Sequence, residues 1–234
     1  KDANKIKEYT KNYSKEDIAA SAQFTAEKNA LNLIKPLILK HKVKSACFAG
    51  GFFLNVKLNQ KIWEEKILEN QWIFPNQGDS GLALGAAFAA MNKVSKDFSP
   101  LRLESYSFGP NFSNQEIKDI LDSRFIEYDF FENIEDITAK YLANNLTIAW
   151  FQGRMESGPR ALGNRSILMS PVDKRNKDIV NKKIKYREPF RPFCPSIMYD
   201  KSEKYFDNYR DEFFMTTSFS VNKFARENFN GGGH

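Results

Sequence analysis

The stretch TIAWFQGRMESGPRALGNRSILM, residues 147–169, determines what fold and chemistry we expect of the second half of this chain. Its first five residues read as a buried strand, and its SILM segment is a second strand candidate. Between the two, residues 153–166 combine three arginines with three glycines and one proline. Glycine lets a backbone bend closely around a ligand, and arginine binds phosphate oxygens with a bidentate fork. The stretch therefore predicts a strand that leads into a loop folded around phosphate.

Positive charge is concentrated in the region that begins with this loop. Residues 154–191 contain eleven lysines and arginines against four acidic residues, whereas the first hundred residues mix the two signs. A second run, KYREPFRPF at 185–193, places further cations on a segment stiffened by prolines. The net charge of +6 would by itself fit a nucleic-acid partner, a phosphorylated small molecule or a solvated basic surface. Cations held in glycine- and proline-shaped turns favour the phosphorylated small molecule, and we do not expect nucleic acid to be the partner.

The first half of the chain predicts helices that alternate with short strands. Apolar residues at helical spacing after a Ser14 N-cap predict a long helix to about residue 40, which Pro36 should kink or end early. The next elements we expect are a strand, a helix, a strand and a helix, at residues 43–49, 58–68, 72–75 and 82–91.

Two turns in this half have the composition of ligand-binding turns. Gly50 and Gly51 end a strand, where backbone N–H groups can approach an anion, although a simple tight turn also explains the pair. Asp79 lies in a glycine-flanked turn before a helix, where a carboxylate can ligate a metal or hold a ribose. The alternative for Asp79 is an N-cap of that helix.

A polar segment that contains Pro100 and Gly109-Pro110 separates the two halves, and we place a domain boundary there. Beyond it, Ser113 and Glu116 have the spacing of a capping box. The elements we expect after the box are helices at 113–123, 133–145 and 178–184, strands at 125–130, 147–151 and 166–169, and an extended segment at 186–199. Alternating strands and helices on both sides of the boundary predict an α/β fold.

The composition is that of a soluble globular protein, 41% hydrophobic and 27% charged. No stretch approaches the roughly 20 apolar residues that span a bilayer, and the first residues lack the apolar segment of a signal peptide. Cys47 and Cys194 lie in apolar surroundings, which predicts buried thiols in a reducing compartment. We therefore expect a cytoplasmic protein without a membrane partner.

Four segments resemble a single protein family. GRMESGPRALGNRSIL and IKYREPFRPFCPSI are similar to the C-terminal domain of the nodulation-type O-carbamoyltransferases, and CFAGGFFLN and IFPNQGDSGLALGAA are similar to the end of that family's N-terminal domain. The four occur in the family's order, and the resemblance covers nearly the whole chain. It implies that residues 1–104 are the C-terminal half of an actin-like ATPase domain. Residues 105–234 would then form an α/β domain like that of threonylcarbamoyl-adenylate synthases.

The resemblance also implies an activity. The synthase-like domain would make carbamoyl adenylate from carbamoyl phosphate and ATP. The actin-like domain would pass the carbamoyl group to a hydroxyl of a sugar or secondary metabolite, at a site that holds the adenylate and a divalent metal, Fe or Mg. Related threonylcarbamoyl and hydrogenase-maturation carbamoyltransferases share both domain types and are the nearest alternative, and an RNA-binding module is a more distant one.

In the actin-like part, the resemblance assigns four residues. Gly50, Gly51 and Asn55 match the nucleotide-contacting glycine pair and the asparagine after it, and Asp79 matches the metal-ligating aspartate. The family's two metal-binding histidines at helical spacing have no counterpart, because the histidines of this chain are His41 and His234. We therefore expect an incomplete metal site and no carbamoyl transfer by this polypeptide alone.

In the synthase-like part, the resemblance assigns five cations. Lys185 and Arg187 match the Lys-x-Arg pair of that domain, and its phosphate-binding loop contains Arg154, Arg160 and Arg165. Dense positive charge of this kind would offset the repulsion between two polyphosphate substrates and stabilise the charge that develops as the adenylate forms.

Overall fold

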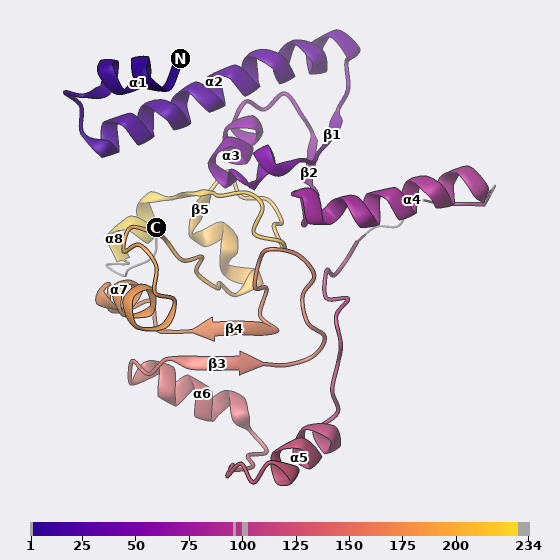
Figure 1. Ribbon diagram of the computed structural model, residues 1–234, viewed down its shortest axis with the longest axis vertical. Coiled ribbons are helices and arrows are strands. Elements are labelled where there is room, and N and C mark those ends of the chain that lie inside the picture. Colours follow the sequence, from indigo (N-terminus) through magenta and orange to yellow (C-terminus); the bar gives the residue numbers. More distant parts are fainter. Residues whose placement is uncertain (1, 96, 100–102, 229–234) are drawn as a thin grey trace. The chain divides into compact units, whose positions relative to one another are not determined.

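The computed structural model describes residues 2–95, 97–99 and 103–228, and the chain forms two compact units (Figure 1). The first unit comprises Lys1–Asp79 and Thr216–Ser218, and the second comprises Ser80–Met215 and Phe219–His234. Both units combine helices with small sheets, which confirms the expected α/β class. The domain boundary at residue 104 stays a prediction.

The first unit consists of two N-terminal helices, a parallel pair of strands and a short helix between the strands. Ser14 caps the long second helix by accepting a hydrogen bond from the Asp17 N–H at 3.0 Å, which confirms the predicted N-cap. The elements of this unit are α1 (Asp2–Thr10), α2 (Lys15–His41), β1 (Ser45–Phe48), η1 (Gly51–Leu54), α3 (Val56–Glu64) and β2 (Asn70–Ile73).

Helix α2 continues past Pro36 as far as His41, so Pro36 does not end the helix early. Proline removes one N–H from the helical ladder. However, Ile38 is only 6% exposed, and its burial in the core stabilises the turn that follows the proline. Lys42 then ends the helix in the left-handed region at a φ of 51°, and its N–H donates to the carbonyls of Ile38 and Leu39.

The core of the first unit lies between α2, α3 and one face of the two-stranded sheet. Leu58 and Ile62 of α3 are fully buried and belong to one cluster with Ala30 and Ile38 of α2. Partly buried apolar side chains of β1 and of the 3-10 turn η1 pack against this cluster. The helices and strands predicted for this half therefore pack around one small hydrophobic core.

The outer face of this sheet is not covered by the described residues, and this decides where Cys47 lies. Ala46 and Phe48 of β1 pack toward the core, so Cys47 between them points to the opposite face. Its register partner there is Trp72, and both side chains are exposed. The prediction of a buried thiol at Cys47 is wrong, because neighbours in a strand do not share a face.

The second unit is built around an antiparallel hairpin. Strands β3 and β4, which confirm the strands predicted at 147–151 and 166–169, pair so that Phe151 lies opposite Arg165. Helix α6 lies along β3 (Figure 1). The elements of this unit are α4 (Leu82–Val94), α5 (Asn114–Ser123), α6 (Ile134–Ala143), β3 (Ile148–Phe151), β4 (Arg165–Leu168), α7 (Arg175–Ile179), the π-helical turn η3 (Val180–Ile184), η4 (Tyr199–Lys204), β5 (Phe206–Asp207), β6 (Ser220–Val221) and α8 (Lys223–Asn228), and η2 (Asp79–Gly81) precedes α4.

Helix α5 confirms one local prediction and contradicts another. Ser113 and Glu116 form the complete capping box, with both reciprocal hydrogen bonds present. The strand predicted at 125–130 is absent, and this described segment is irregular. Phe125 adopts a positive φ of 54°, and the N–H of Ile126 donates to the Leu121 carbonyl at 3.0 Å to end α5. This segment, whose alternating apolar residues predicted a strand, therefore ends helix α5 and pairs with no strand of the described chain.

The segment at 186–198 contains neither helix nor strand, as its three prolines predicted. Within residues 2–95, 97–99 and 103–228, no helix combines the length and the apolar character that crossing a bilayer requires.

Candidate functional site

The basic loop, residues 152–164, is the connection between β3 and β4. It continues the hairpin for one more residue, because the Gln152 N–H donates to the Asn164 carbonyl at 3.0 Å. Three of its residues have positive φ and all are glycine: Gly153 at 51°, Gly158 at 105° and Gly163 at 104°. The loop thus bends sharply at three positions where L side chains are disfavoured, which explains its glycine content.

The carboxylate of Glu156 is the central acceptor inside this loop. The residue is 7% exposed, and its Oε1 accepts hydrogen bonds from the N–H groups of Leu162 (2.7 Å), Asn164 (2.7 Å) and Arg165 (3.2 Å). Burial by itself raises the pKa of this carboxyl, but the backbone hydrogen bonds outweigh burial and hold the pKa below its ordinary value. Glu156 is therefore ionised at neutral pH.

A second segment, residues 106–110, braces the loop from outside. The Ser157 N–H donates to the Tyr106 carbonyl at 2.7 Å, and the Gly109 N–H donates to the Met155 carbonyl at 2.9 Å. A Cβ at position 109 would lie 2.7 Å from the Met155 Cβ, so this close approach requires glycine. Gly109, which marked a domain boundary in the sequence, is in the structure a packing contact of the basic loop.

The guanidinium groups of two predicted phosphate ligands, Arg154 and Arg165, donate hydrogen bonds to carbonyls of the protein itself. Arg154 donates from Nε to the Gly109 carbonyl (3.1 Å) and from Nη2 to the Phe108 carbonyl (2.9 Å). Arg165 donates from Nη1 to the Gln152 carbonyl at 2.6 Å, and its guanidinium carbon lies 3.5 Å from the ring centroid of Phe151. These contacts orient the arginines without neutralising them, because every acceptor is an uncharged carbonyl or an aromatic ring. Their phosphate-binding role stays a prediction.

The second basic run is organised around Asn181, which is 0% exposed. Its Oδ1 accepts a hydrogen bond from Arg187 Nε at 2.6 Å, and its Nδ2 donates to the Arg191 carbonyl at 2.9 Å. Lys185 lies within this segment, residues 181–191, which we call the Lys185 turn, and its Nζ lies 6.0 Å from the ring centroid of Phe193. Among the described residues, the Lys185 ammonium has neither a hydrogen bond nor an ion pair. It is therefore available to bind an anion.

Arg160 and Cys194 connect the two basic runs. The thiol of Cys194 has a pKa raised by burial, and the nearby guanidinium of Arg160 opposes that shift. Cys194 as a whole residue is exposed, so the prediction of a buried residue is wrong, although its thiol is partly desolvated. The segment around it contains neither helix nor strand.

Only some basic side chains of this region form ion pairs. Arg175 pairs with Asp173, Lys177 with Asp178, Arg191 with Glu188 and Arg210 with Glu212, whereas Lys174, Lys182 and Lys183 have no ion pair among the described residues. In the described part of the chain, no such ion pair involves Arg154, Arg165, Lys185 or Arg187. Four of the five predicted cations therefore keep their positive charge uncompensated, and this site can attract an anion.

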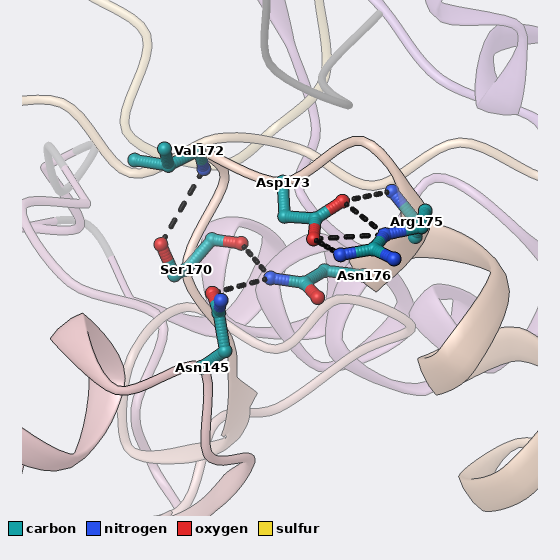
Figure 2. A network of polar contacts seen from close by, with 6 residues as sticks. All are labelled: Asn145, Ser170, Val172, Asp173, Arg175 and Asn176. Carbon is teal, nitrogen blue, oxygen red and sulfur yellow. Dashed lines mark hydrogen bonds and ion pairs between the residues drawn. The ribbon is translucent and has the colours of Figure 1, made fainter.

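A neighbouring polar network surrounds α7 (Figure 2). Asp173 and Arg175 form a two-pronged ion pair with distances of 2.6 to 3.0 Å. This contact holds the pKa of Asp173 at about 2. Asn176, 5% exposed, donates to Asn145 Oδ1 (3.1 Å) and to the Ser170 carbonyl (2.9 Å). The network ties α7 to the end of α6.

An open pocket of about 430 Å³ lies beside this network, with Lys182 and Lys183 of η3 in its wall. The wall also contains Asp173 and Asp178, so its charge is mixed rather than cationic. Because the charge of its wall is mixed, we assign no substrate to this pocket.

In the first unit, the predicted nucleotide-contacting residues form a braced turn. Gly50 has a φ of 104°, and no heavy atom lies within 4 Å of a Cβ built there, so the backbone is approachable. The same is true of the space beside Gly51. Asn55 caps α3 through the Leu58 N–H at 3.1 Å, and its side chain pairs with Gln23 in both directions. The nucleotide-contacting role of these residues stays a prediction.

Buried amides hold this turn from inside the unit. Asn59 is 0% exposed and Gln77 is 2% exposed, and both donate to the Phe53 carbonyl, at 2.8 and 3.1 Å. Asn59 also donates to the Thr216 carbonyl at 2.7 Å, which attaches the Thr216–Ser218 segment to this unit. The only sequence signal was Asn59, a polar residue on the buried face of α3, and Gln77, in the irregular segment after β2, had none.

Asp79, the predicted metal ligand, lies exposed in the 3-10 turn η2. It does not cap the next helix, because the N-cap of α4 is Gly81, which has no side chain for the task. No group of three or more His, Cys, Asp and Glu side chains that could hold a metal is present among the described residues. His234 lies outside the described residues.

Sequence comparison identifies the family. A family model described as carbamoyltransferase N-terminus matches residues 2–88, and one described as carbamoyltransferase C-terminus matches residues 139–234. The chain belongs to the carbamoyltransferase family. In this carbamoyltransferase chain, the basic loop and the Lys185 turn lie in the part matched by the C-terminal model, and the Gly50 turn lies in the part matched by the N-terminal model.

Relatives occur in bacteria and archaea. Nodulation protein NolO of Bradyrhizobium diazoefficiens is 32% identical over 194 residues, which are 82% of this chain and 35% of that protein. An uncharacterised protein of Synechocystis is 38% identical over 200 residues, 82% of this chain and 32% of its own length. An uncharacterised protein of Methanocaldococcus jannaschii is 36% identical over 214 residues, 89% of this chain and 35% of its own length. The chain thus spans about a third of the length of the relatives it matches.

Proposed function

We propose that this carbamoyltransferase chain supplies the anion-binding part of a site that makes carbamoyl adenylate from carbamoyl phosphate and ATP. The carbamoyl group would then pass to a hydroxyl of a sugar or secondary metabolite. The proposal extends the family assignment, which gives carbamoyl transfer, to a particular donor, an activated intermediate and a class of acceptor.

The reactants and products of this reaction explain why its site needs positive charge. Carbamoyl phosphate, ATP and one water would yield carbamoyl adenylate, inorganic phosphate and pyrophosphate. A carbamate oxygen would form the new bond to the α-phosphorus of ATP as the bond to pyrophosphate breaks. Negative charge then accumulates on two leaving groups, and fixed cations stabilise this charge without reorganising.

The observation that carries the proposal is the uncompensated charge of the basic loop and the Lys185 turn. Arg165 and Arg187 are held rigidly by carbonyl acceptors, and Lys185 has no hydrogen-bond acceptor among the described residues. A solvated basic surface would not need its arginines held in one orientation, whereas Arg187 is held by the buried Asn181 and Arg165 by main-chain carbonyls of the loop. We infer that the oriented arginines hold phosphate oxygens and that Lys185 binds one as a mobile point charge.

For the transfer step, we propose that the first unit belongs to an actin-like domain and that its Gly50-Gly51 turn contacts the adenylate. The open space beside both glycines supports this, because backbone N–H groups can approach a phosphate there. The donor set around Asp79 does not fit a complete metal site within the described residues. We therefore derive no step from a metal.

A pyrophosphate exchange assay tests the adenylation step. In the full-length protein, labelled pyrophosphate should enter ATP only when carbamoyl phosphate is present. Lys185→Ala should reduce this exchange at least about tenfold, since it removes a charged contact to phosphate. Lys118→Ala, which changes an exposed lysine of α5, is the matched control and should leave the exchange unchanged. Exchange that does not depend on carbamoyl phosphate would contradict the proposal.

A further inference from the structure

Glu156 places a buried negative charge inside the most cationic segment of the chain. Four acidic residues lie between 154 and 191, and three of them, Asp173, Asp178 and Glu188, form ion pairs with basic side chains. Glu156 forms no ion pair with any described side chain. Its oxygen is instead surrounded by backbone N–H groups, although arginines lie on both sides of it in the sequence.

The geometry around this carboxylate is that of a bound anion. Three N–H groups of the loop, from Leu162, Asn164 and Arg165, converge on Oε1 at 2.7, 2.7 and 3.2 Å. Converging backbone N–H groups of a glycine-bent turn elsewhere form a concavity that binds phosphate or another anion. Here the protein fills the concavity with its own carboxylate.

Within residues 162–165, the Gly163 N–H does not bind Glu156, but it also has an acceptor. Gly163, bent to a φ of 104°, directs its N–H to the Ser166 Oγ at 3.1 Å. The N–H groups of residues 162–165 are therefore all engaged before any substrate arrives. A phosphate that binds this site finds cationic side chains rather than backbone donors.

We propose that Glu156 is the positioning residue of the basic loop: it occupies the loop's own anion concavity, holds the loop in one conformation and directs the phosphate of the substrate to cationic side chains. The identity of that substrate rests on the proposed function, whereas the positioning role does not. Sequence reasoning assigned phosphate binding to the loop as a whole. The structure divides this task, because the backbone binds Glu156 and the side chains remain for substrate.

Hydrogen–deuterium exchange of the full-length protein, read over residues 162–165, tests the positioning role. In Glu156→Gln, which keeps the size of the side chain but removes its charge, exchange of these N–H groups should accelerate at least about tenfold, since hydrogen bonds to charged acceptors are roughly twice as strong as neutral ones. Glu156→Asp should recover part of the protection. Glu127→Gln, an exposed glutamate of an irregular segment, is the matched control and should not change it.

Inorganic pyrophosphate added in the same experiment distinguishes positioning from mere stability. In wild type it should leave exchange at residues 162–165 unchanged, because Glu156 already occupies the donors. In Glu156→Ala, which empties the concavity, it should restore protection there, because an external anion can now enter. Protection of these N–H groups by pyrophosphate in wild type, or no response to it in Glu156→Ala, would overturn the proposal. So would unchanged exchange in Glu156→Gln without pyrophosphate.

Steady-state kinetics keeps this inference separate from the proposed function. Glu156→Gln should raise the KM for carbamoyl phosphate more than about tenfold, while Glu156→Asp restores part of it. If the wild-type protein shows no pyrophosphate–ATP exchange that depends on carbamoyl phosphate, the proposed function fails. The hydrogen-exchange results with pyrophosphate still decide whether Glu156 fills the concavity.

Discussion

Replacing Asn181 with alanine should loosen the Lys185 turn, because the Asn181 side chain forms hydrogen bonds with both Arg187 and Arg191. The residue is 0% exposed, donates from Nδ2 to the Arg191 carbonyl at 2.9 Å and accepts from Arg187 Nε at 2.6 Å. The neutral hydrogen bond contributes about 1 kcal/mol and the bond to the charged guanidinium about 2 kcal/mol. Arg187 retains a contact with the Pro192 carbonyl at 3.2 Å, so we expect a loss of about 2 to 3 kcal/mol.

Hydrogen exchange of the Arg187 N–H measures this loss directly. This N–H donates to the main-chain carbonyl of Asn181 at 3.0 Å, an acceptor that survives the substitution. A loss of about 2 to 3 kcal/mol corresponds to a roughly 30- to 150-fold fall in protection, since about 1.4 kcal/mol changes an equilibrium tenfold.

The control is Asn92→Ala, which makes the same chemical change on the exposed surface of helix α4. Its effect on the Arg187 N–H should be within about threefold, since surface substitutions usually change stability by under about 0.5 kcal/mol. If protection in Asn181→Ala also stays within that range, the turn is not held by this amide, and our account of how Arg187 is oriented is refuted.

Four further substitutions test three separate features. Arg175→Gln should raise the pKa of Asp173 from about 2 toward its ordinary value near 4, measured by carboxyl NMR titration. Because the folded pKa is the lower one, the stabilisation by this pair is present above about pH 4 and lost as pH falls toward 2, so an unchanged pKa would contradict the assignment. Gly109→Ala should destabilise the second unit by about 1 to 3 kcal/mol in denaturant unfolding, because its Cβ would lie 2.7 Å from another Cβ. Gly85→Ala, with open space in helix α4, should be neutral or stabilise by up to about 1 kcal/mol, and equal effects of the two glycine substitutions would refute the packing argument. Ser113→Ala should cost about 1 kcal/mol in denaturant unfolding because it removes the N-cap acceptor, and an unchanged stability would contradict the capping box. The pKa of Glu116 should rise only in part, because the Ser113 N–H, the main cause of its lowering, still donates to the carboxylate.

Local features of the fold were predictable because their causes lie within a few residues. The caps at Ser14 and Ser113 each depend on a side chain and an N–H three positions later. The hairpin strands follow from short apolar runs on both sides of the basic loop. Such patterns need no knowledge of what the segment packs against.

Predictions failed where a distant contact decided between two local possibilities. Helix α2 passes Pro36 because Ile38 is buried in a cluster with residues of α3. The face that Cys47 occupies depends on which side of the sheet α2 and α3 cover. In each case the sequence pattern permitted both outcomes and tertiary packing selected one.

The sequence by itself determined the family, the two strands of the hairpin, the caps at Ser14 and Ser113, and the place where positive charge gathers, because these are properties of residues near one another in the chain. Only the tertiary structure decided what each charged group does. Arg154 contacts the carbonyls of Phe108 and Gly109, more than forty positions away, and Asn181 joins the two ends of a turn. Glu156 looked like one acid among many cations, and the structure made it the acceptor around which the loop is folded, because three backbone N–H groups converge on its oxygen.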